Sequence, residues 1–422
     1  MTFANRAIRW LLALLLVAGL GGSTVVIGQT GGDRTGVTDT EIKIGGFIAQ
    51  SGPVASIGIP VAHGATAYYN TINDLGGING RKIKFIACDD AFNPAQTQAC
   101  VKKLIEQDQV FAIVHPLGTV PLFTVFDQLS KSNIPVVSPH ANAAFLSNPT
   151  TKNIFALQPT NAAFAVALVN HAVNKLKKTR IAIIYQNDVF GNELRTAALA
   201  RMKELGIEPV AEVPHAPTDT NFNPFVVKLQ AAKPEVVMMF TLLVASASIL
   251  KEADALGFKP QWMATNVQTD LTLFKLAGLT AVEGMIATGF AVDPCIRDNV
   301  AAANFRARLA KYFPGEIPSG FSEIAYIGAQ LFSEAALLAG KDLTREGFIA
   351  AMDRIKGFSA DGLVPPVTYT PSDHRGIKDI FLIQAVRGSD PRVQTVARTS
   401  DPICQVSADA GAFVLLEIVN NP

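Results

Sequence analysis

The sequence predicts an α/β protein of two lobes, each built around its own parallel sheet. The chain has 422 residues, which is too long for one ordinary hydrophobic core. Short apolar runs of strand length alternate with amphipathic runs of helix length along most of the chain. This alternation comes in two series, which meet near residue 158. We therefore expect two sheets.

The composition is that of a folded protein with a large buried fraction. Apolar residues make up 49% of the chain and charged residues 17%, which excludes a disordered protein. The 36 basic and 35 acidic residues give a net charge of +1. A chain without excess positive charge gives no sign of a nucleic-acid partner.

The first 29 residues have the pattern of a secretory signal peptide. Arg6 and Arg9 precede an apolar stretch at residues 10–20. The alternative is an uncleaved anchor, because residues 25–27 prolong the apolar character and no clear cleavage site appears. We expect an exported, periplasmic protein.

Four cysteines, Cys88, Cys100, Cys295 and Cys404, lack any C-x-x-C spacing. In an exported protein an even number of cysteines favours disulfides over a metal site. Cys88 ends a predicted strand and Cys100 lies on the next predicted helix, so we predict that these two pair. Two buried free thiols are the alternative. A bond between Cys295 and Cys404 follows only by elimination.

The first series opens with the unit that organises the chain. Residues 42–48 form an apolar strand bounded by glycine, and residues 61–72 carry apolar side chains at helical spacing. Residues 82–88 alternate as a second strand. Such a unit needs a right-handed crossover and gives parallel strands.

Further strands of this series are predicted at residues 110–114 and 134–137. The loops at residues 50–60, 115–120 and 138–143 then lie at the same edge of the sheet, because each follows a parallel strand. Open parallel sheets bind their ligands at this edge.

The second series contains the same alternation. Its strands are predicted at residues 180–185, 210–213, 235–240, 261–264 and 379–386. The chain is expected to cross between lobes near residues 158–160, 283–288 and 364–369. The predicted division is residues 38–158 plus 286–366 for the first lobe, residues 159–285 plus 367–400 for the second, and residues 401–422 for a C-terminal tail. The sequence leaves the role of the tail open, and an edge strand formed by its apolar residues 411–419 is one option.

Enzyme motifs are absent from the sequence. It contains no G-x-S-x-G, H-E-x-x-H or P-loop, and no G-x-G-x-x-G that opens a helix after a strand. The six histidines are scattered without metal spacing, so we expect no metal and no cofactor. His140 lies on a rim loop beside Asn142, where ligand contact and a purely local role are both open. A hydrolase that uses His140 has only this residue in its favour.

An ordered series of short motifs resembles the substrate-binding proteins of ABC importers, in the branched-chain amino-acid (Leu/Ile/Val) type. The matching motifs are GVTDTEIKIG at residues 36–45, Ser51-Gly52-Pro53, Gly76-Gly77-Ile78-Asn79-Gly80-Arg81, Asp89-Asp90, Ser138-Pro139 and Phe190-Gly191. The resemblance runs from about residue 37 to residue 386. It implies a type I periplasmic-binding-protein fold, with two Rossmann-like lobes joined by three hinge crossings and a ligand cleft between them.

The resemblance also implies site residues. Members of this family hold the ligand carboxylate on the loops of the first lobe, at positions that fall here on Gly118, Thr119, Ala141 and Asn142. Helix N-termini after such loops also offer unpaired N–H groups and a positive dipole end. The full set of predicted ligand-binding residues is Ser51, Ile57, Gly118, Thr119, His140, Ala141, Asn142, Phe190, Leu242, Asn266 and Phe321.

Departures from the family pattern bear on the ligand. Amino-acid binders place an acidic residue for the ligand ammonium where this chain has Asn266. An amide in its place forfeits a charge-assisted hydrogen bond, at a cost of roughly 1.5 to 3 kcal/mol. Apolar residues, Ile57, Phe190 and Leu242, occupy positions where the family carries aromatic or tyrosine side chains.

Binding energies indicate that the apolar part of the ligand contributes most of the affinity. Burial of an aromatic ring supplies roughly 4 to 6 kcal/mol, whereas a helix end supplies roughly 0.3 to 2 kcal/mol to a carboxylate. We therefore predict a carboxylate with an aromatic or alkyl body and no required amine. Asp188 and Glu323 could still supply a negative charge, which keeps branched-chain amino acids as the alternative ligand.

The expected protein is thus a non-enzymatic, monomeric binding protein that closes on a small molecule and delivers it to an ABC permease. It meets the membrane only through that permease or through an uncleaved leader. A ligand-sensing module for a signalling partner is the alternative from another class.

Overall fold

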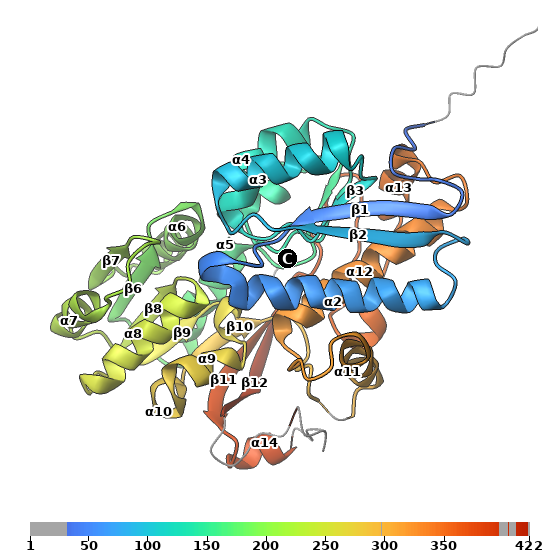
Figure 1. Cartoon of the computed structure of the whole chain (residues 1–422). Coiled ribbons are helices and arrows are strands. Elements are labelled where there is room, and N and C mark those ends of the chain that lie inside the picture. Colours follow the sequence, from blue (N-terminus) through green and yellow to red (C-terminus); the bar gives the residue numbers. More distant parts are fainter. Residues whose placement is uncertain (1–31, 297, 396–403, 405–410, 421–422) are drawn as a thin grey trace, which may run out of the picture. The chain divides into compact units, whose positions relative to one another are not determined.

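The structure is a computed structural model of the chain (Figure 1), and it describes residues 32–296, 298–395, 404 and 411–420. The predicted signal peptide at residues 1–29 lies outside the described residues. Residues 33–422 form one compact unit, to which the following description applies. Within the described part of the chain, helices that combine the length and the apolar character needed to cross a membrane are absent.

The first lobe is built on a five-stranded parallel sheet with the order β2-β1-β3-β4-β5. Its strands are β1 Glu41–Phe47, β2 Lys82–Cys88, β3 Ala112–Val114, β4 Val136–Val137 and β5 Ile154–Phe155. The central strands β3 and β4 are fully buried, as expected where helices cover both faces of a parallel sheet.

Helices from two distant parts of the chain cover this sheet. They are α2 Ala55–Asp74, α3 Pro94–Lys102, α4 Thr119–Ser130, α11 Val300–Tyr312, α12 Gly320–Ala339 and α13 Arg345–Met352. Helix α12 packs along α2 (Figure 1). Gly64 permits this contact, because a Cβ atom there would lie 1.9 Å from the Ser322 carbonyl oxygen. The short helices of this lobe are η2 Gly52–Val54, η3 Lys103–Gln107, η4 Ala144–Leu146 and η7 Ala360–Gly362.

The second lobe has a seven-stranded sheet with the order β12-β11-β10-β9-β8-β6-β7. The strands are β6 Ile181–Gln186, β7 Ala211–His215, β8 Val236–Phe240, β9 Gln261–Ala264, β10 Ile286–Gly289, β11 Asp379–Arg387 and β12 Gly411–Asn420. Strands β6 to β10 are parallel, whereas β11 and β12 run antiparallel to their neighbours. The apolar part of the C-terminal tail thus forms an edge strand of this sheet, β12.

The helices of the second lobe follow its strands in the βαβ manner. They are α5 Asn161–Asn170, η5 His171–Lys175, α6 Val189–Glu204, α7 Asn223–Ala231, α8 Leu243–Ala255, η6 Asn266–Gln268, α9 Thr272–Ala277, α10 Leu279–Val282 and α14 Pro391–Thr395.

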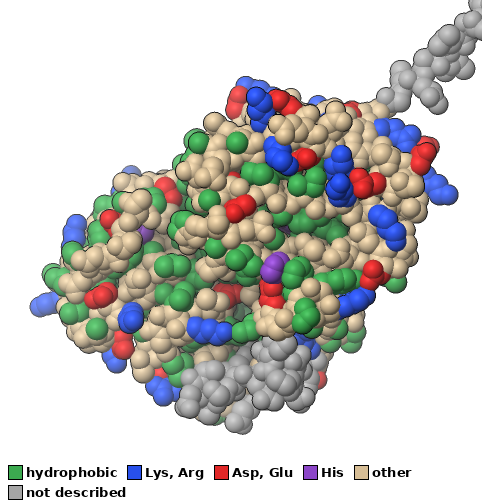
Figure 2. All heavy atoms as spheres, viewed as in Figure 1, with side chains coloured by type: hydrophobic (Ala, Val, Ile, Leu, Met, Phe, Trp, Pro, Cys, Tyr) green, Lys and Arg blue, Asp and Glu red, His purple; other side chains and the backbone are tan. Residues whose placement is uncertain are grey.

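Figure 2 shows Lys and Arg side chains mixed with Asp and Glu over the visible face of the molecule. That face therefore has no large area of a single charge sign.

The prediction of two α/β lobes with three crossings is confirmed. The chain passes between the sheets at residues 156–160, 290–299 and 363–378. The second passage follows β10 instead of lying at residues 283–288, because Ile286 pairs with Met263 of β9 and Gln384 of β11. The exact division of the lobes, at residues 38–158 plus 286–366 and 159–285 plus 367–400, stays a prediction.

Both cysteine pairs are joined. Cys88 at the end of β2 bonds to Cys100 on α3, with their Cα atoms 5.8 Å apart. Cys295, on the second passage between the lobes, bonds to Cys404, with their Cα atoms 5.5 Å apart. The second bond ties the C-terminal part of the chain to the region between the lobes.

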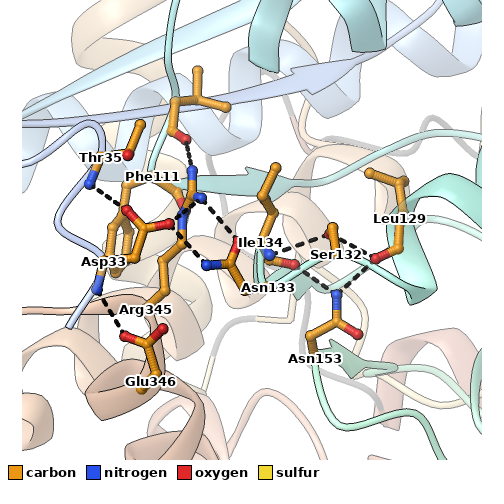
Figure 3. A network of polar contacts seen from close by, with 11 residues as sticks. Asp33, Thr35, Phe111, Leu129, Ser132, Asn133, Ile134, Asn153, Arg345 and Glu346 are labelled. Atoms are coloured by element: carbon orange, nitrogen blue, oxygen red, sulfur yellow. Dashed lines mark hydrogen bonds and ion pairs between the residues drawn. The ribbon is translucent and has the colours of Figure 1, made fainter. Parts of the chain in front are cut away.

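Arg345, the first residue of α13, connects three parts of the first lobe (Figure 3). Its guanidinium donates to the carbonyl oxygens of Val110 and Phe111, at 2.7 and 3.0 Å, and to Asp33 Oδ2 at 2.7 Å. Burial opposes the charge of Asp33, but hydrogen bonds from Thr35 and Asn133 and the charge of Arg345 prevail and lower the pKa of Asp33 to about 2.

We predict that Asp33→Asn lowers the free energy of unfolding by about 2 kcal/mol at pH 6, and by about half that at pH 3. The lowered pKa gives stability that is present above the unfolded pKa of about 3.9 and is lost as the pH falls toward 2. Urea unfolding of both proteins at the two pH values measures the difference. A difference that is the same at pH 6 and pH 3 would contradict the prediction.

Candidate ligand-binding site

A cavity of about 390 Å³ lies between the two lobes. Ten of the predicted binding residues line it, which are Ile57, Gly118, Thr119, His140, Ala141, Asn142, Phe190, Leu242, Asn266 and Phe321. Thr119 and Asn142 of the first lobe therefore share one cavity with Phe190 and Asn266 of the second. Ser51 lies outside the lining; it is exposed, and its N–H donates to Asp89 Oδ1. The part that these residues play in binding stays a prediction.

The N-terminus of α4 lines the cavity on the side of the first lobe and brings backbone N–H groups to it. The Gly118 N–H donates to the His140 carbonyl oxygen at 3.0 Å. The N–H groups of Thr119 and Val120 are in the first turn of α4, where the helix offers no acceptor. Gly118 has φ 97°, and a Cβ atom there would lie 2.2 Å from the ring of Phe92, so only glycine fits.

Asn142, in the loop after β4, is hydrogen-bonded to the first passage between the lobes. Its Nδ2 donates to the Pro159 carbonyl oxygen at 2.8 Å and to Gln158 Oε1 at 3.2 Å. The Asn142 side chain is thus held by the chain segment that joins the lobes, and its position depends on their relative placement.

Two carboxyl groups face the cavity with oxygen atoms that have no hydrogen-bond partner among the described residues. Glu323, on the first turn of α12, has no exposed surface, and both of its oxygens are unpartnered. Asp270 of the second lobe is 5% exposed and leaves Oδ2 unpartnered. Each unpartnered atom is available to a hydrogen-bond donor of a ligand.

The charge state of Glu323 is set by its surroundings. Burial raises its pKa far above the ordinary value, and the nearby negative charge of Asp293 adds to this effect, whereas Arg306 opposes it. These surroundings therefore favour the neutral form of Glu323. Lys and Arg are absent from the described residues that line the cavity.

His140 is a neutral imidazole. It is 8% exposed, and burial lowers its pKa to about 3. Its Nε2 atom has no hydrogen-bond partner within the described part of the chain. A neutral ring can donate or accept one hydrogen bond, which suits ligand contact at the rim. Among the residues that the structure describes, the His140 ring forms no hydrogen bond or ion pair with an acid.

Asp188 is one of the two acids that could supply a negative charge to the ligand. Its carboxylate accepts hydrogen bonds from residues of its own lobe. It caps α6, because Oδ1 accepts the Gly191 N–H at 3.0 Å, and it also accepts from the Gln186 side chain. It lines the cavity as part of the second-lobe rim, but its hydrogen-bonding capacity is partly used.

Glu193 of α6 links the lobes beside the cavity. Its Oε1 accepts the Ala144 N–H of the first lobe at 2.6 Å, and its Oε2 accepts from the Asn161 side chain at 2.9 Å. Burial raises the pKa of Glu193, against the lowering effect of these two hydrogen bonds. This bridge restricts how far the lobes can separate on this side.

Several lining residues were missed by the sequence analysis. Gln158, Asp270 and Phe290 belong to the passages between the lobes or to a loop of the second lobe. Phe381, Ile383, Phe413 and Leu415 come from β11 and β12. The position of Asp270, a few residues after a strand end, was the available signal for that residue. The β11 and β12 residues had no signal, because their approach depends on tertiary pairing.

Comparison with known proteins agrees with the fold and with the family resemblance of the sequence. The model of the periplasmic binding protein family matches residues 41–390. The chain is 28% identical over 306 residues to an amino acid binding protein of Pseudomonas aeruginosa, covering 71% of this chain and 79% of that protein.

Two solved structures share the fold. One is a fatty acid ABC transporter substrate-binding protein from Thermomonospora curvata, with TM-score 0.75, 22% identity, and coverage of 83% of this chain and 90% of that one. The other is a branched-chain amino acid ABC transporter from Thermus thermophilus with bound valine, with TM-score 0.75, 19% identity, and coverage of 82% and 94%.

We predict that Glu323→Gln stabilises the ligand-free protein more at pH 7 than at pH 4. In the unfolded chain Glu323 ionises near pH 4.3, and burial in the folded protein raises its pKa above that value, so the stability of the folded protein falls as the pH rises above 4.3. Glutamine removes this loss. Urea unfolding at both pH values measures the effect, and an equal change at pH 4 and pH 7 would show that Glu323 ionises normally.

Proposed function

The chain belongs to the periplasmic binding protein family, and we propose that it is an exported solute-binding protein that captures a small carboxylate with a largely apolar body and delivers it to an ABC permease. The observation that carries this proposal is the cavity between the lobes. It joins the free N–H groups of the α4 N-terminus to walls of aliphatic and aromatic side chains. The relatives that match the chain are binding proteins and not enzymes.

The α4 N-terminus supports a carboxylate at one end of the ligand. The N–H groups of Thr119 and Val120 need an acceptor, and the helix dipole favours an anion there. The proteins named as binding valine or fatty acid take ligands that share a carboxylate and an apolar body. We expect the same two features in the ligand of this chain.

The apolar walls support most of the affinity. Ile57 and Phe321 of the first lobe and Phe190 and Leu242 of the second are among the lining residues. Micromolar binding needs about −8 kcal/mol, and burial of apolar surface at about 25 cal/mol/Å² is the term that can supply it. This favours an aromatic or alkyl acid, and Asn266 provides no charge for an amine.

An amino acid is the second candidate ligand, and a specific observation favours it. Glu323 and Asp270 bring unpartnered carboxyl oxygens to the cavity from opposite lobes, and an ammonium group would satisfy either of them. Glu323 would then release its proton on binding. The amino acid binding protein of Pseudomonas aeruginosa agrees with this candidate.

Capture would proceed by closure of the lobes. A ligand that contacts both rims binds the closed form better than the open form and shifts the population toward it. The permease would then recognise the closed surface. The alternative partner is a signalling protein that reads the same closure. Pull-down with permease and with signalling candidates separates these two partners.

A matched set of ligands tests the proposed ligand class. Leucine and 4-methylpentanoate share an alkyl body and differ in the amine, and benzoate supplies an aromatic body. We expect both acids to raise the melting temperature and leucine to raise it less, because a ligand that binds the folded state stabilises it by mass action. Tight leucine binding without a response to the acids selects the amino-acid candidate and overturns the preferred one.

We predict that Thr119→Ala weakens binding of the responding carboxylate by more than tenfold. The substitution leaves the Thr119 N–H in place and removes the side-chain hydroxyl, a second donor that this lining residue can offer to the carboxylate. A hydrogen bond to a charged group contributes about 1.5 to 3 kcal/mol, and 1.4 kcal/mol corresponds to tenfold. Thr124→Ala is the matched control, because it makes the same substitution on the same helix at a residue outside the cavity lining, and it should leave affinity unchanged. Calorimetry of both variants measures this, and equal affinities for the two variants would contradict the assignment of Thr119.

A further inference from the structure

The cavity extends beyond the two rims of loops onto a strand face of the second lobe. Phe381 and Ile383 of β11 and Phe413 and Leu415 of β12 line it together with Gly118 and Thr119. All four of these strand residues are apolar. The region was not part of the predicted site, and β12 lies beyond residue 390, where the match to the family model ends.

The pairing of β11 with β12 gathers these side chains on one face. Phe381 is opposite Ile418, Ile383 is opposite Leu415, and Ala385 is opposite Phe413. Residues two apart on a strand share a face, and so do direct antiparallel partners. The opposite face of the pair is buried at Leu382 and Val414.

A β-bulge makes this arrangement possible. The partner of β11 shifts from Glu417 to Leu415 between Leu382 and Ile383, so that Leu416 is skipped. Without the bulge, Leu415 and Ile418 are three residues apart and would face opposite sides of the sheet. The bulge brings both onto the face that carries Phe381 and Ile383; Leu415 lines the cavity, and Ile418 continues the same face outside the lining.

The face is apolar and incompletely covered. Leu415 is 54% exposed and Ile418 is 55% exposed, while Phe381, Ile383 and Phe413 are half-buried. Each exposed apolar surface loses the roughly 25 cal/mol/Å² that burial would provide. A ligand that extends from the cavity would bury this surface.

Strand β12 is held firmly enough to form part of a wall. His171 of η5 contacts Glu417 of β12, with 2.6 Å between Nδ1 and Oε1. Strand β12 also pairs with the whole of β11, Asp379–Arg387. These contacts hold the strand beside the cavity, which Pro294 and Ile296 of the second passage also line.

We propose that the β11–β12 face, formed by Phe381, Ile383, Phe413, Leu415 and Ile418, is a subsite for the apolar tail of an elongated carboxylate. The inference rests on the proposed function, in which the α4 N-terminus holds the carboxylate. From the level of Phe381 to that of Phe413 the face runs over four residues of strand, or about 13 Å. That length exceeds the side chain of a branched-chain amino acid and suits a medium or long alkyl chain.

A series of straight-chain carboxylates tests the length of the subsite. Calorimetry with butanoate through dodecanoate, each below its micelle concentration, measures affinity against chain length. For the unaltered protein we expect a gain of up to about fourfold per methylene group, which levels off once the chain has passed Leu415.

Variants of β12 test which residues form the subsite. Leu415→Ser should weaken decanoate by at least tenfold and leave butanoate within about twofold. Leu416→Ser is the matched control, because it makes the same substitution at the skipped residue, which is outside the cavity lining. It should leave the whole series unchanged.

The outcomes separate this inference from the proposed function. If affinity stops rising at five or six carbons, or if Leu415→Ser and Leu416→Ser behave alike, the subsite is wrong and the proposed function stands. If carboxylates of every length fail to bind, the proposed function fails first. A dimer in solution that Leu415→Ser converts to a monomer would show that a second copy covers this face, and would also overturn the inference.

Discussion

Parallel strand pairing is the constraint on which the rest of this structure depends. Strands that run the same way need a crossover helix, so every loop that follows a strand emerges at one edge of the sheet. In both lobes these loops supply the cavity lining. A lining residue follows each of seven strands in the sequence. Ile57 follows β1, Gly118 follows β3, His140 follows β4, Asp188 follows β6, Leu242 follows β8, Asn266 follows β9 and Phe290 follows β10.

The two antiparallel strands at the other edge of the second sheet follow a different rule. Strands β11 and β12 run antiparallel to their neighbours. They line the cavity with side chains along their length, whereas the parallel strands line it with the loops at their ends. The cavity thus has two kinds of wall. The loop walls carry N–H groups, amides and carboxyls, whereas the strand wall is apolar. An amphipathic ligand with one polar end matches this division.

Desolvation controls the polar chemistry of the cavity. His140 and Glu323 are ionisable side chains, yet burial favours the neutral form of both. A neutral imidazole and a neutral acid donate and accept hydrogen bonds without adding net charge. In the proposed function, the ligand carboxylate is therefore held at the first turn of α4, whose backbone N–H groups cannot be titrated.

The sequence by itself determined the strands, the lobes and the loop rims. Residues 82–88 and 261–264 were predicted with the bounds of β2 and β9, because alternation and flanking turn residues mark short strands clearly. The strand predicted at residues 110–114 is β3 Ala112–Val114, since an apolar run does not reveal where pairing begins. Strand order alone placed the loops at residues 115–120 and 138–143 on the rim, and the family resemblance pointed to Thr119 and Asn142 within them.

Only the tertiary structure decided the buried charge states and the strand wall. The raised pKa of Glu323 depends first on its burial, and then on Asp293 and Arg306, which lie 30 and 17 residues away in the chain. The approach of Leu415 to the cavity depends on a bulge in its pairing with β11. Both are outcomes of contacts between distant segments, and local patterns of hydrophobicity and turn residues carry no information about such contacts.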